Sequence, residues 1–320
     1  MYNTFFHLKR NPFELTPDPD FLFSTKGHNE ALAALYYGVR RHKGFVVLTG
    51  EVGTGKTLLL RCLLKLFKQS NDIAYAYLFN SRLTATEFLQ SIVSDFGLPA
   101  SGKNKSELLL ELCQFVVARG VNKQTTVLIV DEAHHLSADI LEEIRLLTNL
   151  ETTTEKLLQI LLVGQPELDE KLDSVQLRQL KQRIAIRSQL ETLNANETKD
   201  YIERRLRVAG ANSFASTVFP AETIAAVYLC SRGTPRLINT ICDNALLAAY
   251  SRQMRSVTPE IVEGIVEDLR LDVVVPPGME REQEREDVRR AAKLLLDLYA
   301  SLKAKAADEQ LDVPAGNRFP

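Results

Sequence analysis

One short glycine-rich stretch limits what this chain can fold into more than any other feature. Residues 50–57 read Gly-Glu-Val-Gly-Thr-Gly-Lys-Thr; the apolar run 45–49 precedes them and the helix-prone run 58–63 follows. This is the pattern G-x-x-x-x-G-K-[ST] between a strand and a helix, the context that a phosphate-binding P-loop requires. The stretch therefore predicts an α/β fold in which a loop and a helix N-terminus hold a phosphate group.

The residues of this loop predict how a nucleoside triphosphate would be held. Glycines let successive backbone N–H groups turn inward toward phosphate oxygens. The Lys56 ammonium would reach the β- and γ-phosphates, and the Thr57 hydroxyl would ligate Mg²⁺. ATP and Mg²⁺ are therefore the expected cofactors. The candidate nucleotide-binding residues here are Gly50, Glu51, Val52, Gly53, Thr54, Gly55, Lys56, Thr57 and Leu58.

Composition and charge narrow the class of protein and its location. The 320 residues are 45% hydrophobic and 25% charged, which suits a soluble globular protein of two or three domains. The formal net charge of −2 gives no general attraction for nucleic acid, although local basic patches are compatible with it. The N-terminus lacks the apolar region of a signal peptide, and no apolar run reaches the roughly 18 residues of a membrane helix. We expect a cytoplasmic protein, or one bound peripherally at the inner membrane.

Strand-like and helix-like segments alternate through the first two thirds of the chain. This alternation predicts a five-stranded parallel sheet with helices on both faces. Thr84 and Ser106 are the expected N-caps of two of these helices. The strand-like runs are residues 45–49, 73–79, 126–130, 157–164 and 184–190.

The chain is expected to divide into four parts. An arm rich in Phe and Pro, residues 1–27, precedes an α/β nucleotide-binding domain at 28–193. Residues 194–271 are predicted to form a small all-helical lid domain, because helix-prone segments there are separated by Gly and Pro. The last part, 272–320, opens with a Pro-Pro-Gly linker, and its residues 280–307 carry an apolar stripe at helical spacing. That C-terminal helix is expected either to dock on its own domain or to bind a partner.

Two acids directly follow the third strand-like run. Parallel strands end at the crevice where the ligand of such a sheet lies, so Asp131 and Glu132 are expected there. Asp131 would hold the Mg²⁺ water shell, and Glu132 would act as general base for the attacking water. Gln165 ends the fourth run and would hold the γ-phosphate or that water; its alternative role is a turn residue before Pro166.

Histidines and arginines complete the set of candidates. His134 and His135 lack ligand spacing with other His or Cys residues, so no metal beyond Mg²⁺ is assigned. A hydrolytic site also needs positive charge near the departing phosphate. Arg183, in a basic cluster before the fifth run, would be offered to a neighbouring subunit. Arg236, at the start of a helix in the lid, would reach back over the nucleotide.

In this order, the motifs resemble those of the AAA+ ATPases. The resemblance implies that Gln165 is sensor 1, that Arg183 is the arginine finger with Arg178 as the alternative, and that Arg236 is sensor 2. It also implies a homo-oligomer, a ring or a filament. The matching motifs are the P-loop, the strand end Leu128–His134, Gln165, Gln182-Arg183 and Gly233–Arg236.

More narrowly, the arm resembles that of the general secretion pathway protein A (ExeA-type) ATPases, and the TniB-type transposition ATPases are similar in plan. The similarity covers about residues 1–270. It implies that the arm packs near the adenine, which gives Pro12 and Phe13 a role in nucleotide binding. The matching elements are Asn11-Pro12-Phe13, Pro17-Asp18-Pro19, Phe21-Leu22-Phe23, the helix start at 28–32 and Val163–Leu168.

Two functions stay open at this point. Secretion-type members of that family carry a membrane span and a peptidoglycan-binding region after the ATPase, and this sequence shows neither. The first function is an ATPase that assembles through subunit-shared sites and serves a protein partner in a secretion or cell-envelope system. The second is a DNA-bound ATPase regulator of transposition, for which 40–43 and 204–207 offer basic residues. A helicase would need a second RecA-like domain, and a non-hydrolysing scaffold would not need Glu132.

Overall fold

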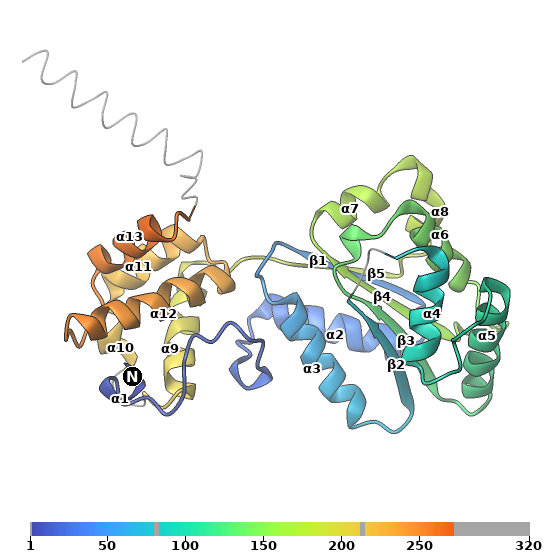
Figure 1. Ribbon diagram of the computed structural model, residues 1–320, viewed down its shortest axis with the longest axis horizontal. Coiled ribbons are helices and arrows are strands. Elements are labelled where there is room, and N and C mark those ends of the chain that lie inside the picture. Colours follow the sequence, from blue (N-terminus) through green and yellow to red (C-terminus); the bar gives the residue numbers. More distant parts are fainter. Residues whose placement is uncertain (1, 80–82, 212–214, 272–320) are drawn as a thin grey trace, which may run out of the picture. The chain divides into compact units, whose positions relative to one another are not determined.

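The computed structural model describes residues 2–79, 83–211 and 215–271 (Figure 1). Met1–Leu269 form one compact unit. The domain boundaries predicted at 27/28 and 193/194 lie inside this unit and stay predictions. The helix predicted at 280–307, with the rest of the last part, lies outside the described residues. Within the described ranges, no helix is both long enough and apolar enough to cross a membrane.

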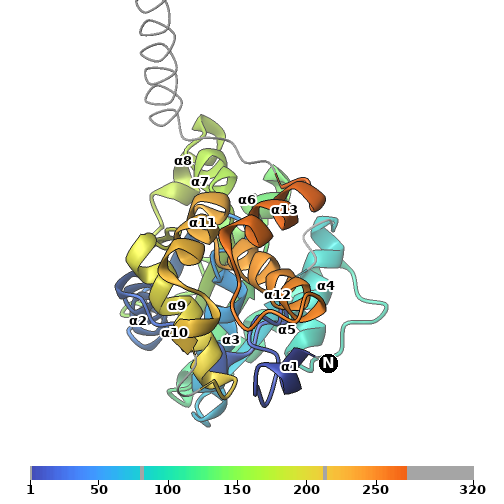
Figure 2. The same ribbon diagram turned by 90° about the vertical axis from the view of Figure 1, so that its left-hand side faces the viewer.

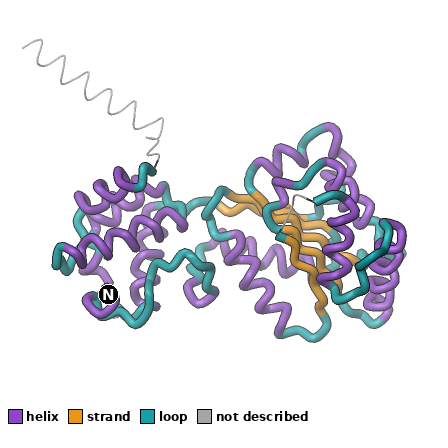
Figure 3. The backbone as a smooth tube through the Cα atoms, in the orientation of Figure 1, coloured by secondary structure: helices purple, strands orange, loops and turns teal. Residues whose placement is uncertain are grey.

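A five-stranded parallel sheet with the strand order β2-β3-β4-β1-β5 organises the α/β part of the chain. Strands β1, β3 and β4 are buried along their whole length, because helices cover both faces of the sheet (Figure 3). The predicted fold class is thereby confirmed, including the five parallel strands. The strands are β1 (Phe45–Gly50), β2 (Ile73–Leu78), β3 (Thr125–Val130), β4 (Leu158–Gly164) and β5 (Ile186–Leu190).

Alternate residues of the central strands serve the two faces of the sheet. Leu128 and Val130 pack in a core with α4, α5 and α6, whereas Val127 and Ile129 pack in a second core with α2 and α3. Because these strands are buried on both faces of the sheet, their sequences are apolar at nearly every position. The helices of this part are α2 (Lys26–Arg40), α3 (Lys56–Lys68), α4 (Ala85–Asp95), α5 (Lys105–Val121), α6 (Ala138–Leu147), α7 (Glu167–Leu172) and α8 (Arg178–Lys181).

The region after β5 is helical, as predicted. Asn194 caps its first helix in a reciprocal capping box with Glu197. Helices α9, α11, α12 and α13 contact one another there (Figure 2). We call residues 194–271 the lid. Its helices are α9 (Ala195–Val208), α10 (Ala215–Val218), α11 (Ala221–Ser231), α12 (Pro235–Ser251) and α13 (Pro259–Asp268).

The N-terminal arm contacts both the lid and the α/β part. The backbone N–H of Lys9 donates to the Ala209 carbonyl at 2.7 Å, and the Phe13 ring meets Phe219 edge-on at 5.9 Å between centroids. Farther along the arm, the Pro17 carbonyl accepts from Arg61 of α3 at 2.6 Å. The arm includes two short helical turns, α1 (Tyr2–Phe5) and η1 (Pro19–Phe21).

One glycine is essential where the α/β part meets the lid. Gly233, between α11 and α12, has φ +70°, and a Cβ on it would lie 1.7 Å from the Leu193 carbonyl oxygen. The Leu193 N–H donates in turn to the Gly233 carbonyl at 2.9 Å. The connection from β5 to α9 therefore packs directly against the turn that starts α12.

Candidate nucleotide-binding and hydrolysis site

The P-loop connects the end of β1 to the start of α3. Gly53 has φ +80° and Gly55 has φ +106°, and Gly55 is the N-cap of α3. A side chain would be strained in this left-handed conformation, which explains why glycine occupies both positions. The backbone thus has the turn that exposes N–H groups at a helix N-terminus to an anion.

Lys56 is a buried cation whose hydrogen bonds go to the loop itself. Its ammonium donates to the Gly50 carbonyl at 2.7 Å and to the Glu51 carbonyl at 2.9 Å. Burial lowers the pKa of Lys56, and the charges of Glu132 and Asp131 act in the opposite direction. Among the described residues Lys56 forms no ion pair, so the position suits an anionic ligand such as a phosphate.

His28, for which the sequence assigned no role, supports this loop from α2. Its Nε2–H donates to the Thr54 carbonyl at 3.1 Å, and its Nδ1 lies 2.7 Å from the Thr25 hydroxyl. A Cβ on Gly55 would lie 3.3 Å from His28 Nε2, so the ring packs closely under the loop. Burial lowers the pKa of His28.

Asp131 directly follows β3 and collects three hydrogen bonds. Its Oδ2 accepts from the Thr57 hydroxyl at 3.2 Å and from the Tyr77 hydroxyl at 2.8 Å, and its Oδ1 accepts from the Glu132 N–H at 2.9 Å. Burial, with the neighbouring Asp131 charge, raises the pKa of Tyr77, so its hydroxyl stays a donor. The adjacent hydroxyl and carboxylate oxygens of Thr57 and Asp131 are ligands that Mg²⁺ prefers.

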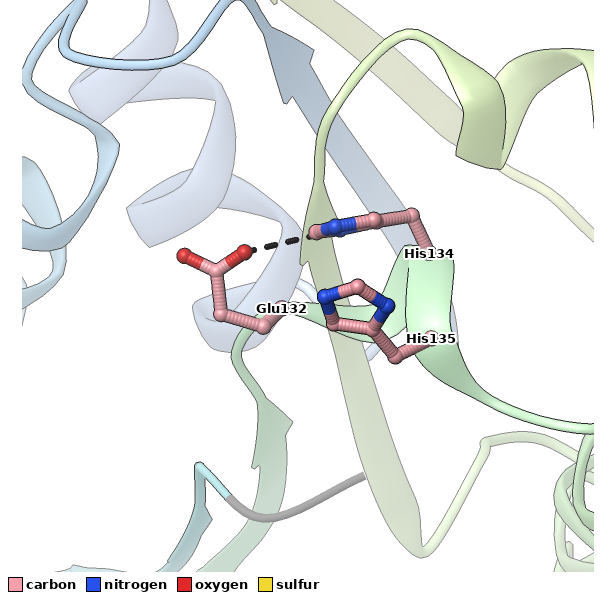
Figure 4. A group of neighbouring side chains, drawn as sticks. All are labelled: Glu132, His134 and His135. Atoms are coloured by element: carbon pink, nitrogen blue, oxygen red, sulfur yellow. Dashed lines mark ion pairs between the residues drawn. The ribbon is translucent and has the colours of Figure 1, made fainter. Parts of the chain in front are cut away.

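Glu132 has a left-handed backbone, with φ +53° and ψ +36°, which is uncommon outside glycine. Its side chain is 42% exposed and points toward His134, with Oε2 of Glu132 3.5 Å from Nδ1 of His134 (Figure 4). His134 belongs to the turn η2 (Ala133–His135). The carboxylate is thus accessible at the end of β3, as a base for water requires.

The sequence assigned no metal ion to His134 and His135, because they lack ligand spacing with other His or Cys residues. In the structure, possible ligand atoms of Glu132, His134 and His135 lie within 4.8 Å of one another. A metal ion there would have to break the contacts of His134 with Gln165: its Nδ1 lies 3.4 Å from the Gln165 N–H donor, and its Nε2 lies 3.0 Å from the side-chain amide. We therefore assign no metal ion to this group and treat His134, Glu132 and Gln165 as one polar cluster.

A cavity of about 330 Å³ brings together the P-loop, Glu132 and Gln165 with the arm and the lid. Lid residues on its wall include Arg236, whose backbone N–H donates to the Gly53 carbonyl at 3.2 Å. Six of the nine predicted loop residues and the predicted lid arginine therefore line one space, whereas Gly50, Glu51 and Thr54 do not line it. The cavity-lining residues of the P-loop are Val52, Gly53, Gly55, Lys56, Thr57 and Leu58.

Two arm residues do not lie where the sequence predicted. Phe13 is 1% exposed, packed in the lid core against Phe219, and neither it nor Pro12 lines the cavity. The arm residues on the cavity wall are the next four, Glu14–Pro17. The Pro12 carbonyl instead accepts from Arg205 at 2.9 Å. The two residues thus hold the arm on the lid, and their neighbours face the nucleotide space.

Arg183 and Arg178 lie outside the lining of this cavity. Arg183 donates to the Thr148 hydroxyl at 2.5 Å and to the Asn149 side chain at 2.6 Å. Arg183 comes shortly before β5, whereas the P-loop follows β1, so Arg183 lies near the opposite end of these two parallel strands from the P-loop. Neither arginine is placed at this chain's own cavity.

Comparisons with known proteins agree with this geometry. Residues 39–172 match the AAA domain family. Over 253 residues the chain is 44% identical to general secretion pathway protein A of Aeromonas hydrophila, a match that covers 79% of this chain. This chain is an AAA+ protein related to general secretion pathway protein A. It spans 45% of that relative's length.

Solved structures show the same AAA+ fold at low sequence identity. Cdc6p of Pyrobaculum aerophilum superposes with a TM-score of 0.60 at 19% identity, covering 78% of this chain and 70% of that one. The ORC2 protein of Aeropyrum pernix gives 0.58 at 20% identity, with 81% and 71% covered. The RuvB branch migration motor of Thermotoga maritima gives 0.51 at 18% identity, with 81% and 74% covered.

Proposed function

We propose that this AAA+ protein binds ATP with Mg²⁺ and hydrolyses it to ADP and phosphate. The observation that carries the proposal is the cavity, which is lined by the P-loop, Glu132, Gln165 and Arg236 together. The residues fit the cofactors, because Lys56 is a buried cation and Thr57 and Asp131 offer adjacent hard oxygen ligands.

Each residue has a separate task in this proposal. The P-loop amides and Lys56 bind the phosphates, and Thr57 and Asp131 hold the metal ion. Bound Mg²⁺ supplies positive charge that offsets the charge of the phosphates. Glu132 takes a proton from the attacking water. Gln165 orients that water or the γ-phosphate, and Arg236 ties the lid to the bound nucleotide.

We further propose that a neighbouring subunit completes the site. A hydrolytic site of this type uses an arginine that stabilises the departing phosphate. Arg183, with Arg178 as the alternative, precedes β5 and does not line this chain's own cavity, which supports a role at the nucleotide of the next subunit. The protein would then work as a homo-oligomer, in the cytoplasm or peripherally at the inner membrane.

The cellular system in which this ATPase would act is proposed from its relative, general secretion pathway protein A. Its name places that protein in the general secretion pathway, so we propose that this chain drives or gates a secretion or cell-envelope assembly. The second candidate is a DNA-bound regulator of transposition. Part of the basic run 204–207 that could serve it is engaged within the fold, because Arg205 is 4% exposed.

ATP turnover measured with and without duplex DNA separates the secretion role from the transposition role. Light scattering follows the assembly state in the same samples. Turnover that is independent of DNA supports the secretion role. Salt-sensitive, DNA-stimulated turnover with filaments that follow DNA length would replace it by the transposition role.

The assignment of the base has its own test. Glu132→Gln keeps the shape of the side chain but removes the basic carboxylate, so ATP binding should persist while hydrolysis falls by at least about 100-fold. Nucleotide affinity by calorimetry and phosphate release measure the two effects. Parental turnover in this variant would show that another group is the base.

A further inference from the structure

His134 lies between the proposed base and the proposed sensor, and its backbone is held from two sides. Lys171 of α7 donates to the His134 carbonyl at 2.6 Å. On the other side the turn η2 packs against the end of β4, where a Cβ on Gly164 would lie 3.1 Å from the His134 nitrogen. The imidazole, 7% exposed, is therefore fixed beside Glu132 (Figure 4). Its other neighbour is the Gln165 side chain.

Both ring nitrogens of His134 face polar partners. Two groups lie at Nδ1: the Gln165 backbone N–H at 3.4 Å and a Glu132 carboxylate oxygen at 3.5 Å. One group lies at Nε2, the Gln165 side-chain amide at 3.0 Å. A neutral imidazole carries one N–H and one acceptor nitrogen, so its single proton decides which of these contacts are hydrogen bonds. Burial and the nearby His135 lower the pKa of His134, which keeps the ring neutral near pH 7.

With the proton on Nε2, the ring donates to Gln165 and cannot donate to Glu132. The Gln165 amide must then turn its oxygen toward His134, which points its NH₂ group away from the ring. Nδ1 accepts from the Gln165 backbone N–H, and the carboxylate of Glu132 is left free to accept a proton from water.

With the proton on Nδ1, the Gln165 backbone N–H loses its acceptor and the two side-chain contacts reverse. The ring donates to the Glu132 carboxylate, which occupies the lone pair that a base needs. Nε2 now accepts from the Gln165 NH₂ group, so the amide oxygen points away from the ring. That oxygen cannot donate to a phosphate and would repel it.

We propose that His134 is a positioning residue that couples Gln165 to Glu132 through the location of its one proton. This inference rests on the proposed function, in which Gln165 contacts the γ-phosphate and Glu132 is the base. A γ-phosphate that accepts from the Gln165 NH₂ group selects the form with the proton on Nε2, and that form releases Glu132. A diphosphate offers no γ-oxygen and leaves the other form available. The site would thereby be ready for hydrolysis only while a γ-phosphate is bound.

The direct test reads the ring nitrogens without any turnover. The full chain, labelled with ¹⁵N-histidine, is compared by two-bond ¹H–¹⁵N spectra without nucleotide, with ADP and with a non-hydrolysable ATP analogue, Mg²⁺ being present throughout. The spectrum of His134→Gln assigns the His134 signals. We expect Nε2 to carry the proton in the analogue complex and the Nδ1-protonated share to rise with ADP. The same tautomer in both complexes would overturn the proposal.

A pair of variants separates hydrogen bonding from packing. His134→Gln keeps one donor and one acceptor, whereas His134→Phe keeps a flat ring of similar size without either. Relative to ADP, affinity for the analogue should fall about 10-fold to 100-fold in the Phe variant, the range for a hydrogen bond to a charged group, and much less in the Gln variant. If the Phe variant keeps the parental ratio, His134 only fills space and the proposal is wrong. Asp139→Asn, at an exposed position in the first turn of α6, is the control.

The experiments distinguish a failure of the proposed function from a failure of the proposed role of His134. A parent protein that binds neither ATP nor its analogue would refute the proposed function itself. Binding and hydrolysis in the parent, together with an unchanged tautomer, would leave the function standing and remove the role of His134.

Discussion

Tyr77 was not among the sequence-derived candidates, and removing its hydroxyl tests how the metal-binding acid is held. Tyr77→Phe deletes the hydrogen bond of 2.8 Å to Oδ2 of Asp131 and leaves the ring in place. Asp131 is 4% exposed, so water replaces the lost donor poorly. The carboxylate keeps its bonds from the Thr57 hydroxyl and the Glu132 N–H.

The expected cost follows from these contacts. A hydrogen bond to a charged group contributes about 1.5–3 kcal/mol, and Tyr77 is half-buried, so we expect the lower end of that range. For a unit of this size, about 1.5 kcal/mol lowers Tm by roughly 3–6 °C. Because the same carboxylate is proposed to hold Mg²⁺, the Mg²⁺ concentration for half-maximal turnover should rise about tenfold.

Calorimetric melting and a Mg²⁺ titration of turnover measure the two effects. Tyr75→Phe is the matched control, because Tyr75 lies two residues away on β2 and packs against Phe67. Its hydroxyl makes no hydrogen bond to any part of the chain that the structure describes. Equal Tm values and equal Mg²⁺ requirements in the two variants would refute the idea that Tyr77 positions Asp131.

Three further predictions concern other parts of the molecule. Gly233→Ala should lower stability by at least about 2 kcal/mol in thermal melts, because left-handed strain adds to a clash with Leu193; Gly97→Ala, with φ +76° and nothing within 4 Å, should show the strain alone. Burial lowers the pKa of His28 from 6.5 in the folded state, so its contribution to the free energy of unfolding is complete above pH 6.5 and is lost as the pH falls. Between neutral and acid pH, the Tm of His28→Gln should therefore fall less steeply than that of the parent. Arg183→Ala should lower turnover of the assembled protein only, with nucleotide affinity of the monomer nearly unchanged.

Local pattern was enough to predict the sheet and the P-loop. Strands β1 to β4 are short runs of mostly apolar residues, and the loop motif has fixed spacing, so neither needs knowledge of distant residues. The cap of α5 shows the limit: Ser106 was expected, but Asn104 accepts from the N–H groups of Ser106 and Glu107 and starts the helix earlier. Two candidate caps within one turn compete through small differences that the sequence does not reveal.

Contacts between distant segments could not be read in the same way. Tyr77 reaches Asp131 because β2 and β3 are paired, with Leu78 opposite Val130. His28 supports the P-loop because the N-terminal turn of α2 lies against Thr54 and Gly55. The arm was expected to contribute Pro12 and Phe13, yet burial of Phe13 in the lid moves the cavity-facing positions along the chain. Each of these depends on how elements pack, which a single sequence does not specify.

The arm gives the lid a second connection to the α/β part, one that is made by noncovalent contacts. One connection runs from β5 to Asn194. The other is the arm itself, which is fastened to the lid at Lys9 and Phe13 and to α3 through Pro17. A body joined at two separate points can rock about the line between them but cannot swivel freely. A lid that moved away from the P-loop would therefore have to carry the arm with it or break the contacts at Lys9, Phe13 and Pro17.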